Sequence, residues 1–292
     1  MWRCAVRLTN CQWTRERSRG LLDHTATLSP GGDFMLTGQA IRHHTDLTNV
    51  VADVAESGIA LIDGVSRAED LTALASGMGT VVPHRDSGPG GVTTIEDRGA
   101  SSPAHAGFTR SALPPHTDRS GVPTPPVLLL TACGRGPTEG GDIVLVDGRA
   151  VHDDLARTSP TALEAFRTPR TVLFGGGDGY LGSVFTHQPG GAIAVRHRLD
   201  PLVRFAPSVA PHVSILRAAI QRHIVTLPAC IGAGYVINNY HWLHGRLAYS
   251  GPRLMYRVTA DPRQSTPIIA GFRSRASEHY VGLFVPTQGV GA

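Results

Sequence analysis

The chain has 292 residues, a length that fits one large domain or two small ones. With 41% hydrophobic and 17% charged residues it has enough apolar side chains for a sizeable core, which excludes global disorder. The formal net charge is +4, every basic residue is an arginine, and the arginines are scattered among few aromatics, which argues against a nucleic-acid partner. No apolar stretch reaches roughly eighteen residues, so we expect no transmembrane helix and no membrane partner.

The residue usage also indicates the fold class and the compartment. The 34 glycines and 21 prolines predict many turns and long loops, which favours a β-rich fold over a helical bundle. The N-terminus lacks the apolar core of a secretory signal, so we expect a cytoplasmic protein. The cysteines have no zinc-site spacing and are expected to be reduced thiols: Cys4, Cys11, Cys133 and Cys230.

In chain order, residues 1–32 show no regular hydrophobic period and are expected to form a peripheral or poorly ordered arm. We expect the rest of the chain, residues 33–292, to form a single domain. Within it, the stretch 81–126 is rich in Pro, Gly, Ser and Thr and is long for a structureless loop. Residues 84–112 are therefore expected to act as a lid or substrate loop.

The first elements of the domain alternate between helix and strand. Apolar residues recur at helical spacing over 44–58, and Gly58 suits the C-terminal cap of that helix. The run 59–65 is short, apolar and β-type. Ser66, with a glutamate three residues later, opens a second helical pattern over 66–79 with a capping-box signature.

From residue 127 onward β-type runs dominate. Two helical patterns interrupt them, one over 148–166 with a break near Ser159 and Pro160, and one over 211–227. The β-type runs cover 127–133, 142–148, 170–176, 192–198, 233–239 and 253–260. We therefore predict one α+β domain, mainly β, in which a barrel or sandwich core is buttressed by helices.

The stretch SALPPHTDRS, residues 111–120, contains a candidate for half of a metal site. His116 and Asp118 are separated by one residue, and in an extended segment residues i and i+2 point to the same side. Both side chains can therefore reach one ion, while Thr117 serves only as a spacer. Two histidines and one carboxylate on one face of the ion are the ligands of non-haem Fe(II) oxygenases. Taken alone, the pair also fits a polar loop, so the prediction needs a second histidine elsewhere.

The best candidate for that histidine is His244, in the stretch NNYHWLHGRLAYSGPRLMYR over residues 238–257. His241 is the alternative, but it lies on the opposite face if the segment is extended. Arg253 and Arg257 follow on a strand-like run and share one side of it. A guanidinium is always charged and grips a carboxylate with two parallel hydrogen bonds, as the far end of a 2-oxoglutarate co-substrate requires.

Together these segments resemble the taurine/clavaminate-type (TauD/TfdA-like) branch of the Fe(II)/2-oxoglutarate-dependent dioxygenases. In order and spacing, PPHTDRS, TPPVLLLTAC, GGDIVLVDG, GYVINNYHWLHGR and RLMYR are similar to that family's pattern from Pro114 to Arg257. The helix–strand–helix opening extends the resemblance further towards the N-terminus. Each element alone is weak, whereas the HxD, GGD and HGR–R–R elements together are specific.

The resemblance implies a double-stranded β-helix (jelly-roll) core flanked by helices, and it assigns site residues position by position. His116, Asp118 and His244 match the family's iron ligands and thus its catalytic centre. Arg253 matches the arginine that binds the far carboxylate of 2-oxoglutarate, and Arg257 matches a second arginine near the keto-acid end. The implied enzyme uses Fe(II), 2-oxoglutarate and O2 and releases succinate and CO2.

The chain departs from the family pattern directly after GGD. Many relatives carry there a threonine whose hydroxyl helps to hold the co-substrate, whereas this chain has Ile143. The hydrogen bond is then either missing or supplied by another group, for which Thr131 is the candidate. Relatives that halogenate carry a small residue in place of the carboxylate, so the presence of Asp118 argues against halogenation.

The substrate is the least determined part of the prediction. Substrates in this branch are often amino acids, their derivatives or small natural-product intermediates, so we expect hydroxylation of an unactivated C–H bond in such a molecule. Desaturation, epoxidation or cyclisation would use the same site. The candidate substrate-binding residues are His84 in the lid and the group Arg196, Arg198 and Asp200, whose mixed charges suit a zwitterion. The GC-rich style of the sequence suits a tailoring enzyme of secondary metabolism, such as antibiotic biosynthesis.

A non-catalytic jelly-roll protein that binds a metal or another ligand is the more distant alternative. Arg253 argues against it, because a passive metal site has no need of a grip for 2-oxoglutarate. The sequence leaves the oligomeric state undetermined.

Overall fold

The computed structural model describes residues 34–274 apart from 37–38, 42, 45 and 100–101. The arm expected over residues 1–32 lies outside this described part. Among the helices described, none combines the length and the apolar character needed to cross a bilayer.

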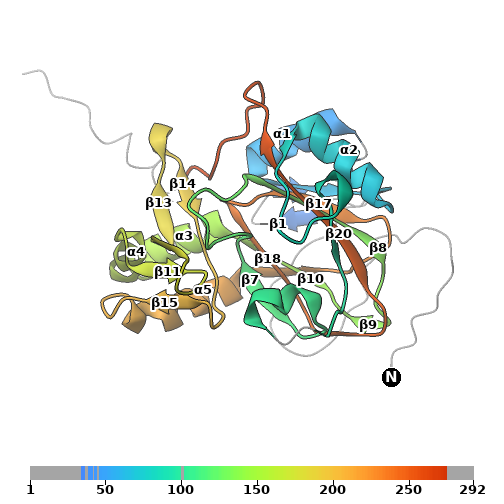
Figure 1. Ribbon diagram of the computed structural model, residues 1–292. Coiled ribbons are helices and arrows are strands. Elements are labelled where there is room, and N and C mark those ends of the chain that lie inside the picture. Colours follow the sequence, from blue (N-terminus) through green and yellow to red (C-terminus); the bar gives the residue numbers. More distant parts are fainter. Residues whose placement is uncertain (1–33, 37–38, 42, 45, 100–101, 275–292) are drawn as a thin grey trace, which may run out of the picture.

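Two sheets with mostly antiparallel pairing form the centre of the molecule (Figure 1). In the larger sheet the order is β3-β4-β17-β8-β20-β5, and β6 also pairs with β20. Its strands are β3 His43–His44, β4 Ile59–Ile62, β17 Gly234–Asn238, β8 Leu128–Arg135, β20 Leu254–Pro262, β5 Gly79–Val81 and β6 Thr93–Ile95. In the smaller sheet the order is β16-β10-β18-β7. Its strands are β16 Ile224–Leu227, β10 Ile143–Asp147, β18 Trp242–Arg246 and β7 Leu113–His116.

The space between the two sheets is filled by one hydrophobic cluster to which both contribute. Leu129 and Cys133 of β8 meet Leu145 of β10 and Trp242 of β18 there. Because side chains alternate along a strand, Leu130 of β8 points the other way, into the cluster beneath the N-terminal helices. Strand β8 is therefore buried on both faces, which explains its uninterrupted apolar run.

Helices α1 (Leu47–Ser57) and α2 (Ala68–Met78) cover the outer face of the larger sheet (Figure 1). Helix α1 ends as predicted at Gly58, whose φ of 77° is a left-handed conformation that glycine adopts without strain. The capping box predicted at Ser66 is wrong. Helix α2 begins after Arg67, which makes no side-chain cap hydrogen bond.

A third hydrophobic cluster lies beside the sheets and is built mainly by three helices and several short strands (Figure 1). The helices are α3 Gly148–Thr158, α4 Pro160–Arg167 and α5 Val213–Arg222. The strands of this part are β11 Val172–Phe174, β12 Tyr180–Gly182, β15 Val203–Phe205, β13 Phe185–His187 and β14 Ile193–Val195. The break predicted near Ser159 and Pro160 separates α3 from α4. The helix predicted over 211–227 is too long, because its last residues leave α5 and pair with β10 as strand β16.

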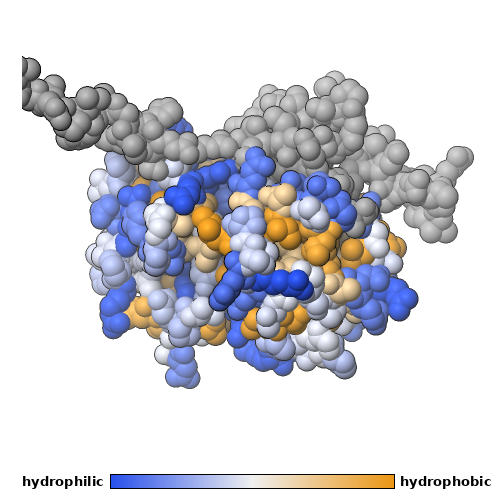
Figure 2. All heavy atoms as spheres, turned by 90° about the horizontal axis from the view of Figure 1, so that it is seen from above, coloured by the Kyte–Doolittle hydropathy of each residue, from blue (hydrophilic) through white to orange (hydrophobic). Residues whose placement is uncertain are grey.

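The remaining elements are short. They are β1 Phe34–Leu36, β2 Gln39–Ile41, β9 Glu139–Gly140, β19 Tyr249–Ser250, η1 Pro89–Gly91, η2 Pro103–Phe108, η3 Pro189–Gly191 and η4 Ala210–His212. Seen from above, hydrophobic and hydrophilic residues are interspersed on the visible face (Figure 2). The mainly β domain with flanking helices is confirmed, with two separate sheets in place of a closed barrel.

Candidate functional site

His116 and His244 are direct neighbours on two paired strands. His116 is the last residue of β7, His244 lies in the middle of β18, and the two are register partners. Their ring centroids are 4.3 Å apart, since directly opposed residues of an antiparallel pair project from the same face. Residues 128 positions apart in the chain are thus brought together by strand pairing.

The local sequence explains how β7 can approach β18 so closely. Strand β7 lies at the edge of the smaller sheet and pairs there only with β18. Pro114 and Pro115, which lack an N–H donor, are therefore tolerated in it. Between the pairs at His244 and Arg246 the register shifts by a bulge. A Cβ atom at Gly245 would lie 2.4 Å from the carbonyl oxygen of Leu113. The glycine of the HGR motif is therefore required by the contact between the two strands.

The imidazole of His116 has a defined tautomer. Its Nδ1 lies 3.0 Å from the carbonyl oxygen of Pro114, which can only accept, so Nδ1 carries the proton and Nε2 keeps its lone pair. Burial lowers the pKa of His116 and brings the pKa of His244 well below its usual value. Both rings are therefore neutral near pH 7, which is the form that binds a metal ion.

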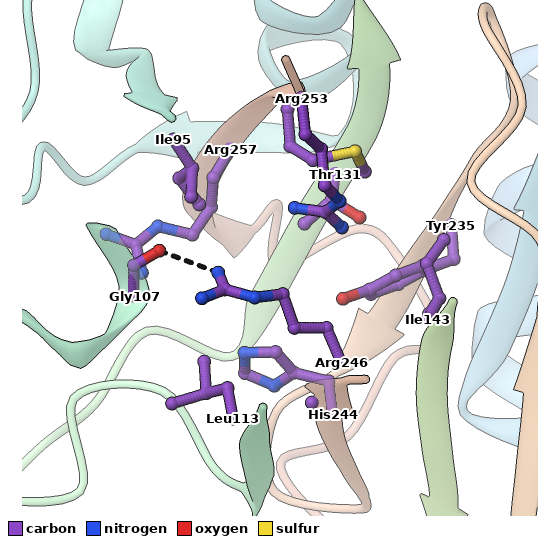
Figure 3. A pocket seen from close by; sticks show the side chains of 12 residues that line it. Ile95, Gly107, Leu113, Thr131, Ile143, Tyr235, His244, Arg246, Arg253 and Arg257 are labelled. Carbon is purple, nitrogen blue, oxygen red and sulfur yellow. Dashed lines mark hydrogen bonds between the residues drawn. The ribbon is translucent and has the colours of Figure 1, made fainter. Parts of the chain in front are cut away.

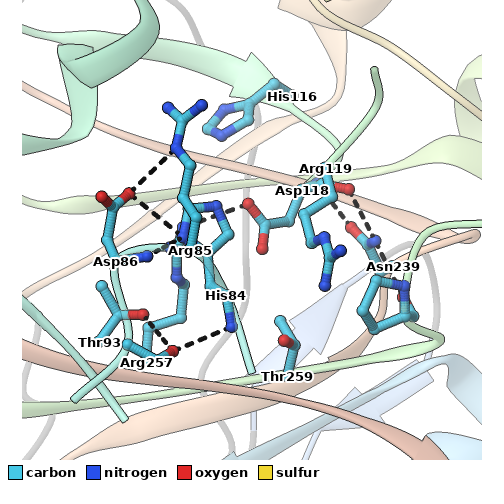
Figure 4. Close-up of polar contacts among 12 residues, drawn as sticks. His84, Arg85, Asp86, Thr93, His116, Asp118, Arg119, Asn239, Arg257 and Thr259 are labelled. Carbon is cyan, nitrogen blue, oxygen red and sulfur yellow. Dashed lines mark hydrogen bonds and ion pairs between the residues drawn. The ribbon is translucent and has the colours of Figure 1, made fainter. Parts of the chain in front are cut away.

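Asp118 follows β7 by two residues, and its carboxylate is buried. One oxygen, Oδ1, accepts a hydrogen bond from Nη1 of Arg257 at 3.2 Å, while Oδ2 has no partner among the described residues (Figure 4). Burial by itself raises the pKa of Asp118, but the charges of Arg257 and the two imidazoles outweigh it and hold the pKa below its usual value. The carboxylate is thus an anion with one oxygen available to a ligand.

These three residues supply the right donors for Fe(II) but do not yet form a closed cluster. In the part of the chain that the structure describes, no group of three His, Cys, Asp or Glu side chains stands in position to hold a metal ion. The carboxylate of Asp118 is turned towards Arg257. Its unpartnered oxygen and the neutral imidazoles nonetheless match the donor set that non-haem iron takes, two nitrogens and one carboxylate.

His241, the alternative third ligand, is engaged elsewhere. Its Nε2 donates to Oδ1 of Asp147 at 2.9 Å, and both side chains are buried. Its ring packs against Phe272, with centroids 5.0 Å apart. Of the two histidines that the sequence left open, the structure therefore places His244 beside His116.

A small cavity of about 70 Å³ adjoins His244 and is lined by Arg253, Thr131 and Tyr235 (Figure 3). Arg253 is buried, and its Nε has no hydrogen-bond partner among the described residues. The same holds for the hydroxyl of Thr131. A buried cation beside unpartnered polar groups is suited to receive an anion, because such groups are costly when nothing satisfies them.

Ile143 and Tyr235 line this cavity together, which bears on the missing threonine. The isoleucine contributes only apolar atoms, whereas the phenol of Tyr235 points into the cavity towards Thr131 and Arg253 (Figure 3). Burial raises the pKa of Tyr235 to about 12, so its hydroxyl stays protonated and can donate. The sequence analysis missed Tyr235. A tyrosine in an otherwise apolar buried strand was the available signal, since its hydroxyl needs a partner.

A family model described as taurine catabolism dioxygenase TauD, TfdA family, matches residues 39–259. The chain belongs to this dioxygenase family. The family predicted from the motifs is confirmed, and with it the class of enzyme, a 2-oxoglutarate-dependent dioxygenase. No curated protein sequence matches the chain.

Solved structures of iron oxygenases resemble this dioxygenase at low sequence identity. An asparagine oxygenase with Fe(II), 3-hydroxyasparagine and succinate has a TM-score of 0.58 at 15% identity, over 74% of this chain and 77% of that one. The non-haem iron oxygenase OrfP with Fe and α-ketoglutaric acid has a TM-score of 0.58 at 14% identity, over 77% and 84%. PvcB from Pseudomonas aeruginosa has a TM-score of 0.55 at 18% identity, over 84% and 95%. The likeness confirms the jelly-roll fold.

The dioxygenase has a second, larger cavity of about 500 Å³ that is lined by His116 and Asp118. It is lined in part by the predicted lid, through His84, Arg85, Asp86, Ile95, Ala104, Gly107 and Phe108. The opposite wall includes residues of the glycine-rich turn between β11 and β12. Arg257 lines both cavities and therefore stands where they meet.

The predicted substrate residues of the dioxygenase differ in where they lie. His84 and Arg198 line the large cavity, and Arg198 forms an ion pair with Asp200, Nε to Oδ1 at 2.9 Å. Arg196 is not among the lining residues. Its guanidinium donates to the carbonyl oxygens of Ser120 and Val122. Arg196 therefore does not line the large cavity but supports two residues that do.

Arg246 of the HGR motif connects residues 107–111 to strand β18. Its guanidinium donates to the carbonyl oxygens of Gly107 at 2.7 Å and Ser111 at 2.9 Å, and also to that of Thr109 (Figure 3). A buried arginine can satisfy several carbonyls at once because it carries five N–H donors. The same short motif therefore supplies a candidate metal ligand and the side chain that holds residues 107–111.

Proposed function

We propose that this protein is an Fe(II)- and 2-oxoglutarate-dependent dioxygenase that hydroxylates an unactivated C–H bond of an amino acid, an amino-acid derivative or a small natural-product intermediate. The observation that carries the proposal is the pairing of His116 with His244, with Asp118 two residues on and the Arg253 cavity alongside. Succinate and CO2 are the other products. The similar structures support it, because they are complexes with Fe(II), α-ketoglutaric acid, succinate or hydroxylated amino acids.

In this proposal His116, Asp118 and His244 hold the metal. Nε2 of His116 would bind the ion, because Nδ1 donates to the carbonyl oxygen of Pro114. Oδ2 of Asp118, which has no partner among the described residues, would be the oxygen that binds the metal. When bound, the iron supplies O2 activation, with 2-oxoglutarate as the electron source.

Arg253 takes the far carboxylate of 2-oxoglutarate in the small cavity. Its guanidinium is buried, so the charge–charge contact is strong and water is excluded. Tyr235 and Thr131 donate hydroxyl hydrogen bonds to the same carboxylate and replace the hydroxyl that Ile143 lacks. Arg257, at the junction of the cavities, lies towards the keto-acid end.

The substrate occupies the large cavity, where His84 and the pair of Arg198 and Asp200 offer polar contacts. Residues 84–112 act as its lid. The C–H bond that is held nearest to Asp118 and His116 reacts, so substrate pose decides between hydroxylation and desaturation, epoxidation or cyclisation. We place the enzyme in the cytoplasm, in a biosynthetic pathway that modifies small molecules.

The test is an anaerobic titration of the protein with Fe(II) and 2-oxoglutarate, followed by the visible metal-to-ligand charge-transfer absorption. The wild type should develop this band, and His116→Ala or His244→Ala should abolish it. His241→Asn is the matched control, because it changes a buried histidine that faces Asp147 and should keep the band. A wild type without the band would overturn the proposal. Succinate release should then identify substrates, and Asp118→Ala should abolish that release.

A further inference from the structure

Asn239 lies in the turn between β17 and β18, five residues before His244, and is 2% exposed. Its side-chain amide forms hydrogen bonds to both the N–H and the C=O of Asp118. The amide oxygen Oδ1 accepts from the N–H of Asp118 at 2.7 Å, and Nδ2 donates to the C=O of Asp118 at 3.0 Å (Figure 4). Nδ2 also donates to the carbonyl oxygen of Pro126 at 3.1 Å.

The backbone of Asp118 needs such a partner. Strand β7 ends at His116, so Asp118 has left the sheet and lies in a turn. The next residue, Arg119, has a φ of 52°, an uncommon conformation for a residue with a side chain. Buried backbone groups are nearly always hydrogen-bonded, and here a side-chain amide takes the place of a neighbouring strand.

Each residue of the HTD motif is thus anchored by a different contact. His116 is paired with His244 in the sheet. Thr117 exchanges hydrogen bonds with the backbone of His197, its N–H donating to the carbonyl at 2.9 Å and its hydroxyl accepting from the N–H at 3.1 Å. Thr117, expected to be only a spacer, therefore also fixes this segment to the backbone of His197. The backbone of Asp118 is hydrogen-bonded to the side chain of Asn239.

We propose that Asn239 is a positioning residue that sets the place of the Asp118 carboxylate relative to the two imidazoles. The inference rests on the proposed function, because it treats Asp118 as a metal ligand. Asn239 lies in the turn that leads from β17 of the larger sheet to β18 of the smaller sheet, and His244 lies in β18. One short segment therefore carries one ligand and fixes the backbone of another.

Asn238, the residue directly before Asn239, provides a matched control. It is equally buried, at 2% exposure, and its Nδ2 likewise donates to two carbonyl oxygens, those of Ile269 at 2.6 Å and Gly271 at 3.2 Å. Those partners belong to the C-terminal segment and not to the site. Asn238→Ala and Asn239→Ala therefore remove similar sets of hydrogen bonds, and only the second touches Asp118.

The experiment measures the dissociation constant of Co(II), read from its visible absorption, together with the thermal unfolding of the metal-free proteins. Asn239→Ala should weaken Co(II) binding about 10- to 100-fold, the range typical for a lost supporting contact behind a ligand. Asn238→Ala should leave the constant within about threefold of the wild type, even where its loss of thermal stability is similar. Asn239→Asp keeps the size of the side chain and loses the donor, so it should also weaken binding if Asn239→Ala does not fold.

A second arm asks whether Asn239 acts through Asp118. In an Asp118→Ala background, adding Asn239→Ala should cause no further loss of Co(II) affinity. Equal weakening by both asparagine variants, or a full additional loss in the Asp118→Ala background, would overturn the inference and leave the proposed function standing. A wild type that binds no Co(II) would overturn the proposed function, and the inference with it.

Discussion

The guanidinium of Arg257 lies 3.2 Å from the carboxylate of Asp118, Nη1 to Oδ1, with both side chains largely buried. The family pattern predicted Arg257 near the keto-acid end of the co-substrate. Arg257 lines both cavities, which agrees with that prediction. It also has a second effect, because its positive charge lowers the pKa of Asp118 and favours the ionised carboxylate. The buried carboxylate is thereby kept as an anion.

Loss of this cation should destabilise the metal-free protein. Arg257→Met leaves the Asp118 carboxylate buried and uncompensated, and we expect the free energy of unfolding to fall by about 3 kcal/mol. The double variant Asp118→Asn/Arg257→Met should lose less than the sum of the single variants. Urea denaturation followed by circular dichroism gives all four values. Strictly additive losses would show that the pair is not coupled.

The affinity for 2-oxoglutarate should depend on the hydroxyl of Tyr235. Tyr235→Phe keeps the ring and loses a hydrogen bond to a carboxylate, so the dissociation constant should rise about tenfold. Tyr249→Phe is the control, because its ring lies beside the Arg253 guanidinium, 5.4 Å from the centroid, but does not line the small cavity. Both constants can be read from anaerobic titrations with Fe(II) present. An unchanged constant in Tyr235→Phe would assign the missing hydroxyl to another group.

Loss of Arg246 should loosen residues 107–111. Arg246→Met removes the donors to Gly107 and Ser111, so amide hydrogen exchange over residues 107–111 should accelerate at least about tenfold. Arg110 lies within residues 107–111 and forms an exposed ion pair with Asp97. Arg110→Ala removes this pair and should change the exchange little. Mass spectrometry of the exchanged peptides measures the effect. Equal protection in wild type and Arg246→Met would contradict the anchoring role.

The stability of the metal-free protein should fall in mild acid because of His197. Burial lowers the pKa of His197 to about 3, and neither ring nitrogen has a partner among the described residues. Between its usual pKa of about 6.5 and pH 3 the unfolded chain binds the extra proton, so stability is lost as the pH falls through this window.

His197→Leu tests this pH dependence. The wild type should lose about 2 kcal/mol more than the variant between pH 7 and pH 5, because the other titrating groups are common to both. Urea denaturation of the metal-free proteins at the two pH values supplies the comparison. Parallel pH dependence in wild type and variant would mean that His197 takes up a proton in the folded state.

Much of the fold follows from local pattern. The apolar runs of β4, β8, β10, β17 and β20 lie where the sequence predicts strands, and Gly58 ends α1 as expected. Local pattern fails where tertiary contacts decide. The last residues of 211–227 suit a helix by spacing but pair with β10, and α2 begins without the cap predicted at Ser66. Spacing cannot tell a buried strand from the end of a buried helix.

The sequence by itself determined the family and the candidate chemistry, because HxD, HGR and the two arginines are ordered motifs that can be recognised without coordinates. Only the tertiary structure showed that strand pairing sets the ring of His244 beside His116, while His241 contacts Asp147. It alone brought Tyr235 to Arg253 and Asn239 to Asp118. Asp118 and Asn239 are 121 positions apart, and His116 and His244 meet only because their strands pair. A linear pattern does not show which of such distant side chains come into contact when the sheets form.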